Sequence, residues 1–321
     1  MDNNIKCNLC NGTSLDLLYG AIKRDGSFYD IYKCRGCGLG ITWPIPARTE
    51  LESIYSSENY RAHEKRFIFP IEQISRYLRG RRLAKINKYS AKGQILDIGC
   101  GRGIMLSLAK KRGWKTFGLE FNSETAFHAK EVIGLDIRTG NIKNSGFEAS
   151  TFDAITIWHV LEHLENPSET ISECNRLLKP EGVLVISVPN LQSIQSRISG
   201  KHWFHLDVPC HLYHFSEKNL SQMLISKGFS IEEVNYFSWE QSIFGFIQSL
   251  FNMSGVTNNF LYDTLKSKQL RKDYTLASNL KNILLTILLL SPIFLFSILL
   301  TGLEVLLRRG GEVAVYAKKK E

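Results

Sequence analysis

Short apolar runs alternate with amphipathic segments through the middle of this 321-residue chain. The runs are rich in Ile, Val, Leu and Phe, as is typical of buried strands, and the segments between them place apolar residues at helical spacing. Strands that alternate with helices predict a parallel sheet with crossover helices on its faces. The predicted strands are 94–99, 115–120, 135–139, 153–158, 182–188 and 229–237, and a further strand, 312–317, follows later in the sequence.

The pattern changes on both sides of this region. Residues 1–43 contain paired cysteines separated by strand-like stretches, whereas residues 44–92 predict helices, including a basic amphipathic run. Residues 238–310 hold the most apolar stretch of the chain. We therefore expect four parts. They are 1–43, a helical cap or linker at 44–92, a main domain of 93–237 completed by 311–321, and a helical insertion at 238–310.

The apolar stretch 282–303 contains 22 residues without a charge, which is long enough for a transmembrane helix. A single crossing would put strand 312–317 on the wrong side of the membrane, away from the sheet that it is expected to join. Pro292 lies in the middle of the stretch, where it would break or kink a helix. We therefore predict a helical hairpin that enters one leaflet, with 242–253 in the membrane interface. Packing of these helices in a core or a dimer is the alternative.

Composition and charge narrow the choice of partners. A net charge of +9 is modestly basic, and 44% apolar and 22% charged residues are ordinary for a globular protein. The charge fits a solvated surface, an anionic membrane or an anionic substrate, and no binding motif points to nucleic acid. Because the first residues hold no apolar signal segment, we expect the cysteines in a reducing cytosol. The predicted location is cytoplasmic, at the cytoplasmic face of the membrane.

Four cysteines form two Cys-x-x-Cys pairs with 23 residues between them. Thiolate pairs at this spacing are typical of a tetrahedral Zn²⁺ site with four ligands and no open position. We expect a structural zinc ribbon, because so short a segment buries little core and the metal would replace that core. Thiols without a metal are the alternative. The predicted ligands are Cys7, Cys10, Cys34 and Cys37.

A glycine-rich segment joins the strand 94–99 to a helical pattern. The glycines Gly99, Gly101 and Gly103 let the backbone turn sharply and let a ligand approach closely. Their spacing differs from the G-x-G-x-x-G of a dinucleotide-binding loop. Asp97 would repel a diphosphate but suits a ligand with an ammonium and a sulfonium. Glu120, at the end of the next strand, can accept both hydroxyls of a ribose. The segment therefore favours S-adenosylmethionine.

These motifs resemble those of class I S-adenosylmethionine-dependent methyltransferases, most closely the group that carries a zinc ribbon and occurs in glycan pathways. Residues 95–103 resemble the first motif of the family, and 152–163 and 176–186 resemble the fourth strand and the turn into the fifth. The resemblance implies an α/β, Rossmann-like, seven-stranded sheet with helices on both faces, whose last strand inserts antiparallel beside the fifth. It implies that Tyr55 and Tyr60 cover the cofactor, although packing would suit these tyrosines equally. Asn141 stands where the family more commonly has Asp. The implied cofactor contacts are Asp97, Gly99, Gly101, Gly103, Glu120, Asn141 and Ile142.

Two histidines are candidates for acid–base chemistry with the acceptor. His159 directly follows the fourth predicted strand, at the edge where open parallel sheets bind ligands, and imidazole suits a general base. The segment 202–216 carries four histidines without regular period, and His211 best matches the central histidine of the family's loop. We interpret Glu162 as mainly structural, beside a helix N-terminus, with a weaker idea that it and His163 help bind a divalent ion. In 202–216 itself no carboxylate–histidine spacing indicates a second metal site.

The sequence therefore predicts an enzyme that transfers methyl from S-adenosylmethionine to the oxygen or carbon of a sugar or glycan-linked acceptor. The expected partners are a small-molecule or glycolipid acceptor and a peripheral or monotopic membrane contact. Methylation of a lipid or quinone is the alternative within the same chemistry. A non-catalytic scaffold with this fold is the alternative outside it, although a scaffold has no need of Asp97 and Glu120.

Overall fold

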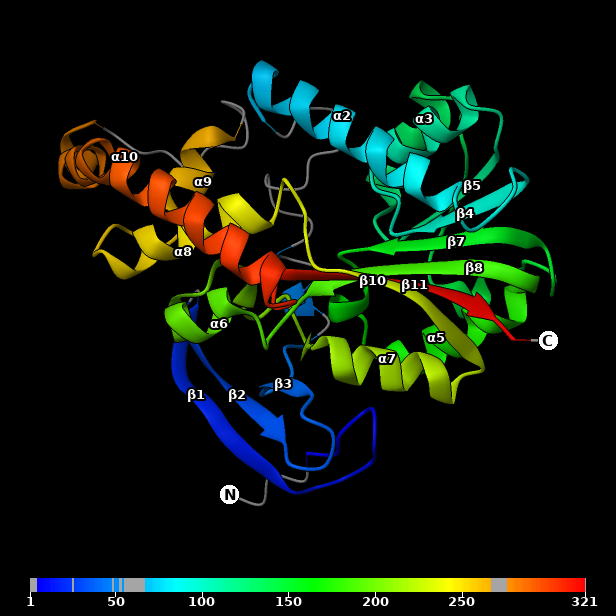
Figure 1. Ribbon diagram of the computed structural model, residues 1–321, viewed down its shortest axis with the longest axis horizontal. Helices are drawn as coiled ribbons and strands as arrows, with labels where there is room; N and C mark the ends of the chain where they lie inside the picture. The colour runs from blue at the N-terminus through cyan, green and yellow to red at the C-terminus, as the bar shows by residue number, and fades with distance from the viewer. Residues whose placement is uncertain are drawn as a thin grey trace.

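The computed structural model describes residues 5–24, 26–47, 49–51, 54, 67–266 and 276–320. Within them a seven-stranded sheet has the order β10-β11-β8-β7-β4-β5-β6 (Figure 1). β11 runs antiparallel to both neighbours, and the other six strands share one direction. The strands are β4 (Gln94–Ile98), β5 (Lys115–Glu120), β6 (Asp136–Thr139), β7 (Phe152–Trp158), β8 (Leu178–Pro189), β10 (Phe229–Asn235) and β11 (Glu312–Lys319).

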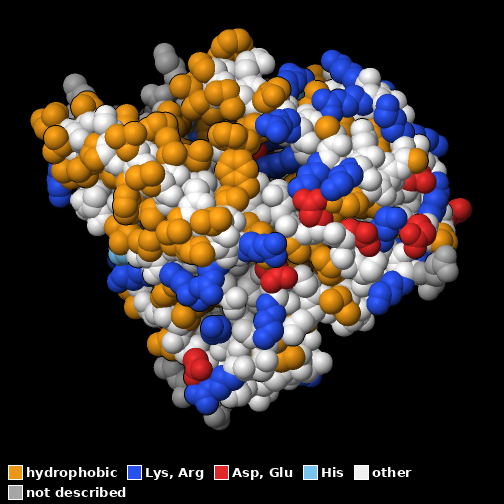
Figure 2. Space-filling model, in the orientation of Figure 1, with side chains coloured by type: hydrophobic (Ala, Val, Ile, Leu, Met, Phe, Trp, Pro, Cys, Tyr) orange, Lys and Arg blue, Asp and Glu red, His pale blue; other side chains and the backbone are white. Residues whose placement is uncertain are grey.

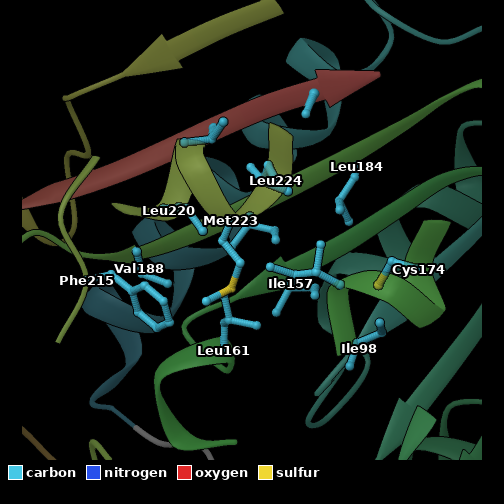
Figure 3. Packing of buried hydrophobic residues seen from close by; sticks show 14 of the residues in the cluster. Ile98, Ile157, Leu161, Cys174, Leu184, Val188, Phe215, Leu220, Met223 and Leu224 are labelled. Atoms are coloured by element: carbon cyan, nitrogen blue, oxygen red, sulfur yellow. The ribbon is translucent and has the colours of Figure 1, made fainter. Parts of the chain in front are cut away.

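Helices cover both faces of this sheet, so the predicted fold class is confirmed. Successive side chains of a strand point to opposite faces. Ile95 therefore packs into the core under α2 and α3, while Leu96 packs into the core under α5 and α7. Figure 3 shows the second core, where Met223 and Leu224 of α7 meet Ile157 of β7. The helices of the domain are α2 (Phe69–Ile86), α3 (Ile104–Lys111), α4 (Ser123–Phe127), α5 (Pro167–Leu177), α6 (Ile194–Ser199) and α7 (Glu217–Ser226).

A second sheet joins the beginning of the chain to the segment 202–216. β3 pairs with β9 at Gly40–His214 and Ile41–Tyr213. A Cβ on Gly40 would lie 2.8 Å from the Cβ of His214, so this close approach requires glycine. The segment 202–216, predicted to be irregular, thus contains a strand. The strands are β1 (Leu15–Arg24), β2 (Ser27–Cys34), β3 (Gly40–Trp43) and β9 (Tyr213–His214), and we call them the N-terminal sheet.

The insertion before β11 differs from the prediction. It contains α8 (Ser242–Met253), α9 (Phe260–Leu265) and α10 (Leu276–Leu306). The predicted hairpin is wrong, because α10 is one helix that includes Pro292. In Figure 1 its first turns are seen end-on and its second half runs across the view, so the helix bends. A proline removes one backbone donor and kinks a helix, but the neighbouring residues do not form a turn that reverses it.

The prediction that 242–253 lies in a membrane interface is also wrong. Phe246 and Phe251 of α8 are fully buried. This helix contacts α10 on one side and α6 on the other. Its apolar face is therefore used inside the protein, and α10 is the element that carries the exposed apolar surface.

Both ends of α10 are fixed to the rest of the protein. Near its start, Ile283 and Leu285 pack on the buried core of α8. At its other end the buried carboxylate of Glu304 accepts hydrogen bonds from the backbone N–H groups of Gln195 (2.7 Å) and Gly311 (3.2 Å). Since β11 begins directly afterwards and enters the sheet, α10 returns to the domain from which it came.

Candidate functional site

The glycine segment forms a tight turn after β4. Gly99, Gly101 and Gly103 have φ values of 69°, 52° and 69°, in the left-handed region that favours glycine. A Cβ would lie 2.3 Å from Val160 at Gly99 and 2.3 Å from Leu135 at Gly103. At Gly101 a Cβ would meet no atom of the described residues within 4 Å. Gly101 therefore borders the open space from which a ligand can approach.

Glu120 is fixed beside this turn. One oxygen of its carboxylate accepts a hydrogen bond from the N–H of Gly101 (2.8 Å), and the other accepts from the N–H of Asn122 (3.0 Å). Burial raises the pKa of Glu120, and these backbone donors partly offset that rise. The carboxylate therefore has a set position at the end of β5, as a group that binds a pair of hydroxyls requires.

Asp97 lies at the end of β4 and is buried. The hydroxyl of Thr156 on β7 donates to its Oδ1 at 2.6 Å. Burial raises the pKa of Asp97 to about 7, and the nearby charge of Glu120 acts in the same direction. A ligand with positive charge placed here would favour the ionised carboxylate, so the residues present fit S-adenosylmethionine.

Asn141 and Ile142 follow β6. Asn141 is exposed, and its Oδ1 accepts from the N–H of Asn144 at 3.1 Å, which caps a short 3₁₀ turn. Ile142 is buried in the core, so only its backbone remains available to a ligand. A carbonyl oxygen has two lone pairs, and the adenine contact predicted for Asn141 stays a prediction. Tyr55 and Tyr60 lie outside the described residues.

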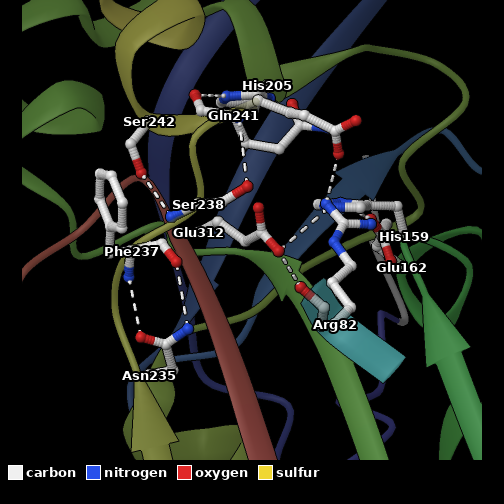
Figure 4. A network of polar contacts seen from close by, with 12 residues as sticks. Arg82, His159, Glu162, His205, Asn235, Phe237, Ser238, Gln241, Ser242 and Glu312 are labelled. Atoms are coloured by element: carbon white, nitrogen blue, oxygen red, sulfur yellow. Dashed lines mark hydrogen bonds and ion pairs between the residues drawn. The ribbon is translucent and has the colours of Figure 1, made fainter. Parts of the chain in front are cut away.

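His159 lies between two carboxylates directly after β7 (Figure 4). Its Nε2 is 3.4 Å from Oε1 of Glu312, and its Nδ1 is 3.6 Å from Oε1 of Glu162. Burial disfavours a charged ring, but the two carboxylates outweigh it and raise the pKa of His159 to about 10. The ring is 22% exposed, and the two carboxylates favour its charged form in the ligand-free site. It can serve as a base only together with a carboxylate that takes its proton.

Glu312 is a site residue that the sequence interpretation missed. It is the first residue of β11 and lies opposite Pro189 at the end of β8. The Ser187 hydroxyl donates to it. Because β11 is antiparallel, its first residue reaches the edge where the parallel strands end. One sequence signal could have identified Glu312: it is a carboxylate at the first position of the strand that was expected to insert antiparallel.

Arg82 of α2 covers the same edge. Its guanidinium lies 4.8 Å from the ring centre of Trp158 and donates to Glu240 at 2.7 Å. Burial would raise the pKa of Glu312, but His159 lowers it and the charge of Arg82 acts in the same direction as His159. The cap region thus contributes a cation to the site, which the sequence interpretation had not assigned.

The segment 202–216 brings His211 to the other side of Glu162. The Nε2 of His211 is 3.9 Å from Oε1 of Glu162, and its Nδ1 is 2.9 Å from the carbonyl oxygen of His205. The structure therefore brings the two predicted histidines, His159 and His211, to one carboxylate. Glu162 lies in a 3₁₀ turn, Leu161–His163, and not at the start of α5. Glu162 is thus near the start of a short 3₁₀ helix, while α5 begins only at Pro167.

The four predicted cysteine ligands come together beside the N-terminal sheet, and Cys34 ends β2. Their sulfur atoms all lie within 4.8 Å of one another. The Sγ atoms of Cys7 and Cys37 are 3.4 Å apart, and those of Cys10 and Cys34 are 3.5 Å apart. Four thiolates that converge in this way fit a closed tetrahedral site for zinc.

Curated proteins match part of this chain in sequence. The chain is 29% identical over 143 residues to a Mycolicibacterium smegmatis protein named for S-adenosylmethionine-dependent methyltransferase activity, covering 43% of this chain and 52% of that protein. It is 35% identical over 107 residues to a ubiquinone biosynthesis O-methyltransferase of Actinobacillus pleuropneumoniae, covering 30% and 46%. The chain thus spans about half the length of these curated relatives.

Among solved structures, the [4+2]-cyclase SpnF matches with a TM-score of 0.53 at 16% identity, over 86% of this chain and 97% of that one. This likeness shows the fold alone. Residues 60–234, which are more than half of the chain, match the model of a family described as a methyltransferase domain. The chain therefore belongs to the methyltransferase-domain family.

Proposed function

We propose that this protein transfers a methyl group from S-adenosylmethionine to a hydroxyl group of a small acceptor held at a membrane surface. The observation that carries the proposal is the position of two sets of groups at one edge of the sheet. Asp97 and Glu120 lie at the ends of β4 and β5, while His159 and Glu312 lie at the end of β7 and the start of β11. Open sheets of this kind bind ligands at that edge.

The two sets divide the work of methyl transfer. S-adenosylmethionine supplies an electrophilic methyl group on a sulfonium. Asp97 would hold its cationic part and Glu120 its ribose. The acceptor oxygen forms a bond to the methyl carbon while the carbon–sulfur bond breaks, and the hydroxyl proton must leave. The pair of His159 and Glu312 would take that proton. A charged imidazole and an ionised carboxylate together can accept one more proton, which would end on the carboxylate.

Calorimetric titration with S-adenosylmethionine tests the first half of this proposal. Between pH 6 and pH 7.5 we expect the affinity to rise about fivefold, because a carboxyl with a pKa of about 7 ionises over this range. The sign follows from charge: a cationic ligand binds the ionised form and releases the proton. The ligand's own amine, with a pKa of about 7.7, loses part of its charge by pH 7.5, and the fivefold figure includes that loss.

Asp97→Asn is the matched variant, since it keeps the side-chain shape. It should bind more weakly and lose this pH dependence, whereas Asp136→Asn, at the start of β6, should retain both properties. Absence of any binding by the unaltered protein would leave only the scaffold alternative.

The membrane part of the proposal rests on α10. The segment Asn279–Leu306 is long and apolar enough to cross a membrane, and only 6% of the residues in its most apolar part are buried. Figure 2 shows its apolar side chains gathered over one part of the surface, with Lys and Arg side chains along the lower border. Because both ends of α10 return to the domain, we infer that it lies in one leaflet and does not cross. Cations beside an apolar surface suit anionic headgroups.

A lipid or quinone acceptor is supported more strongly than a sugar. Relatives that cover part of the chain are named ubiquinone biosynthesis O-methyltransferases, and an acceptor dissolved in the membrane would account for the exposed apolar helix. The sugar or glycan-linked acceptor, O- or C-methylated, stays a prediction. Assays with labelled methyl donor against lipid extracts, hydroxylated quinones and sugar nucleotides distinguish these acceptors.

Vesicle flotation tests the membrane contact. The protein should float with vesicles that contain anionic lipid, and Ile287→Glu with Leu288→Glu should abolish flotation because these side chains are 69% and 71% exposed on α10. Leu17→Glu with Phe28→Glu is the control, since these side chains are 58% and 59% exposed on the N-terminal sheet and should not matter. Equal flotation of the two variants would contradict the assignment, as would an unaltered protein that stays soluble without detergent.

We also propose that Cys7, Cys10, Cys34 and Cys37 hold a structural Zn²⁺ ion. The convergence of their sulfur atoms supports this proposal. With four protein ligands the ion would have no open position, so it would stabilise the N-terminal sheet and take no part in methyl transfer.

A further inference from the structure

A second group of metal-ligand side chains lies beside His159. It consists of Glu162 and His163, from the turn after β7, and His211, from the segment 202–216. Their ligand atoms all lie within 4.8 Å of one another. The N–H of Leu212 donates to the carbonyl oxygen of Glu162 at 2.9 Å, so the backbone itself holds the two segments together.

The hydrogen bonds of both histidines determine which nitrogen carries the proton. The Nδ1 of His163 is 2.9 Å from the carbonyl oxygen of Cys210, and the Nδ1 of His211 is 2.9 Å from that of His205. A carbonyl can only accept, so Nδ1 is the protonated nitrogen in each ring and Nε2 carries the lone pair. Histidines that bind metals are usually oriented in this way, by a hydrogen bond from the other nitrogen to a carbonyl or carboxylate.

The carboxylate of Glu162 is the independent sign of a ligand. Its side chain is 1% exposed, and neither of its oxygen atoms has a hydrogen-bond partner among the described residues. The Nδ1 of His159, at 3.6 Å, and the Nε2 of His211, at 3.9 Å, are too far from Oε1 of Glu162 for hydrogen bonds. His159 lies between Glu162 and Glu312, so one cationic ring faces two buried carboxylates, and Glu162 stays costly to bury unless a second cation satisfies it.

We propose that Glu162, His163 and His211 bind a divalent transition-metal ion. Two imidazoles and one carboxylate suit zinc, iron or manganese better than magnesium or calcium, which prefer oxygen ligands alone. Three protein ligands leave at least one coordination position open, as in sites that bind a substrate oxygen. Because Glu162 also lies 3.6 Å from His159, an ion bound to it would be near that ring and could hold the acceptor oxygen. The metal site rests on its own geometry, and only this last role rests on the proposed function.

Cobalt(II) titration of the full-length, metal-depleted protein tests the site, because cobalt reports its ligands by absorption. We expect the unaltered protein to bind one more ion per chain than Glu162→Gln or His211→Asn, with the weak bands of a nitrogen–oxygen site. Loss of an outer-shell partner typically weakens metal binding by about 10- to 100-fold, and loss of a direct ligand should weaken binding of this second ion at least as much. The thiolate bands of the cysteine cluster should be identical in all three proteins. The test compares the number of ions bound by the unaltered protein and by the variants, so its result does not depend on what the cysteines bind.

Glu312→Gln is the control, since it removes a carboxylate on the opposite side of His159 and should retain the second ion. Retained affinity for S-adenosylmethionine in Glu162→Gln and His211→Asn excludes unfolding as the cause of metal loss. Equal metal content in all variants would overturn the site. A second ion in a protein that does not bind S-adenosylmethionine would support the site and refute the proposed function.

Discussion

Replacing His159 by alanine is expected to lower the turnover number by about 10²- to 10⁴-fold, the usual contribution of a general acid–base group. The affinity for S-adenosylmethionine should stay unchanged, because Asp97 and Glu120 hold the methyl donor on neighbouring strands. The physical reason is that the ring between Glu312 and Glu162 would pass the acceptor proton on to a carboxylate, and alanine cannot do so. Release of product from tritium-labelled S-adenosylmethionine with a membrane lipid extract measures the effect.

Two further variants separate chemistry from packing. Glu312→Gln keeps the size of the side chain but removes its charge, and it should lower turnover by about tenfold or more if His159 and Glu312 act as a pair. His202→Ala is the matched control, because His202 is exposed in the same segment that carries His211. Unchanged turnover in both His159→Ala and His211→Ala would refute the assignment of these residues.

Loss of the cysteine cluster should have the largest effect on stability. Structural zinc sites contribute an apparent ~10–16 kcal/mol in small domains, so Cys34→Ser should leave the N-terminal sheet unfolded. The effect should reach the active site, because β3 pairs with β9 and the Thr42 hydroxyl donates to the carbonyl oxygen of His211 at 2.6 Å. Hydrogen exchange should therefore increase over 202–216, and turnover should fall while binding of S-adenosylmethionine persists.

Cys174→Ala is the control for this experiment. Cys174 is a buried cysteine of α5, outside the cluster, and its replacement should leave the zinc content and the exchange of 202–216 unchanged. Full zinc content in Cys34→Ser would contradict the proposed ligand set. Normal turnover by a Cys34→Ser protein without zinc would show that the N-terminal sheet does not support His211.

The central sheet was predictable because its signals are local. The central parallel strands β4, β7 and β8 are largely buried on both faces and therefore appear as short apolar runs, which is why 153–158 corresponds closely to β7 (Phe152–Trp158). The glycine turn was predictable for a similar reason. Positive φ at Gly99 and Gly103, together with side chains that leave no room for a Cβ, imposes glycine at fixed spacing.

The rest of the site depends on contacts between distant segments. His211 reaches Glu162 across 49 positions of sequence, so no spacing rule within 202–216 reveals the pair. Glu312 and Arg82 come from opposite ends of the domain and meet only because β11 is antiparallel and α2 crosses the sheet edge. The hairpin prediction failed for another reason: hydropathy describes the length of an apolar segment but does not show how sharply a proline bends it.

The position of β11 has a consequence for biosynthesis. In the described sheet β11 lies between β10 and β8. Without β11, β10 has no partner strand and one edge of β8 is unpaired. The ribosome makes α10 before β11, so the most apolar helix emerges while two strand edges are still open. Open edges and exposed apolar surface invite misassociation of nascent chains. Early docking of α10 on a membrane would shield that surface during synthesis, and Glu312 would be the last group of the site to arrive.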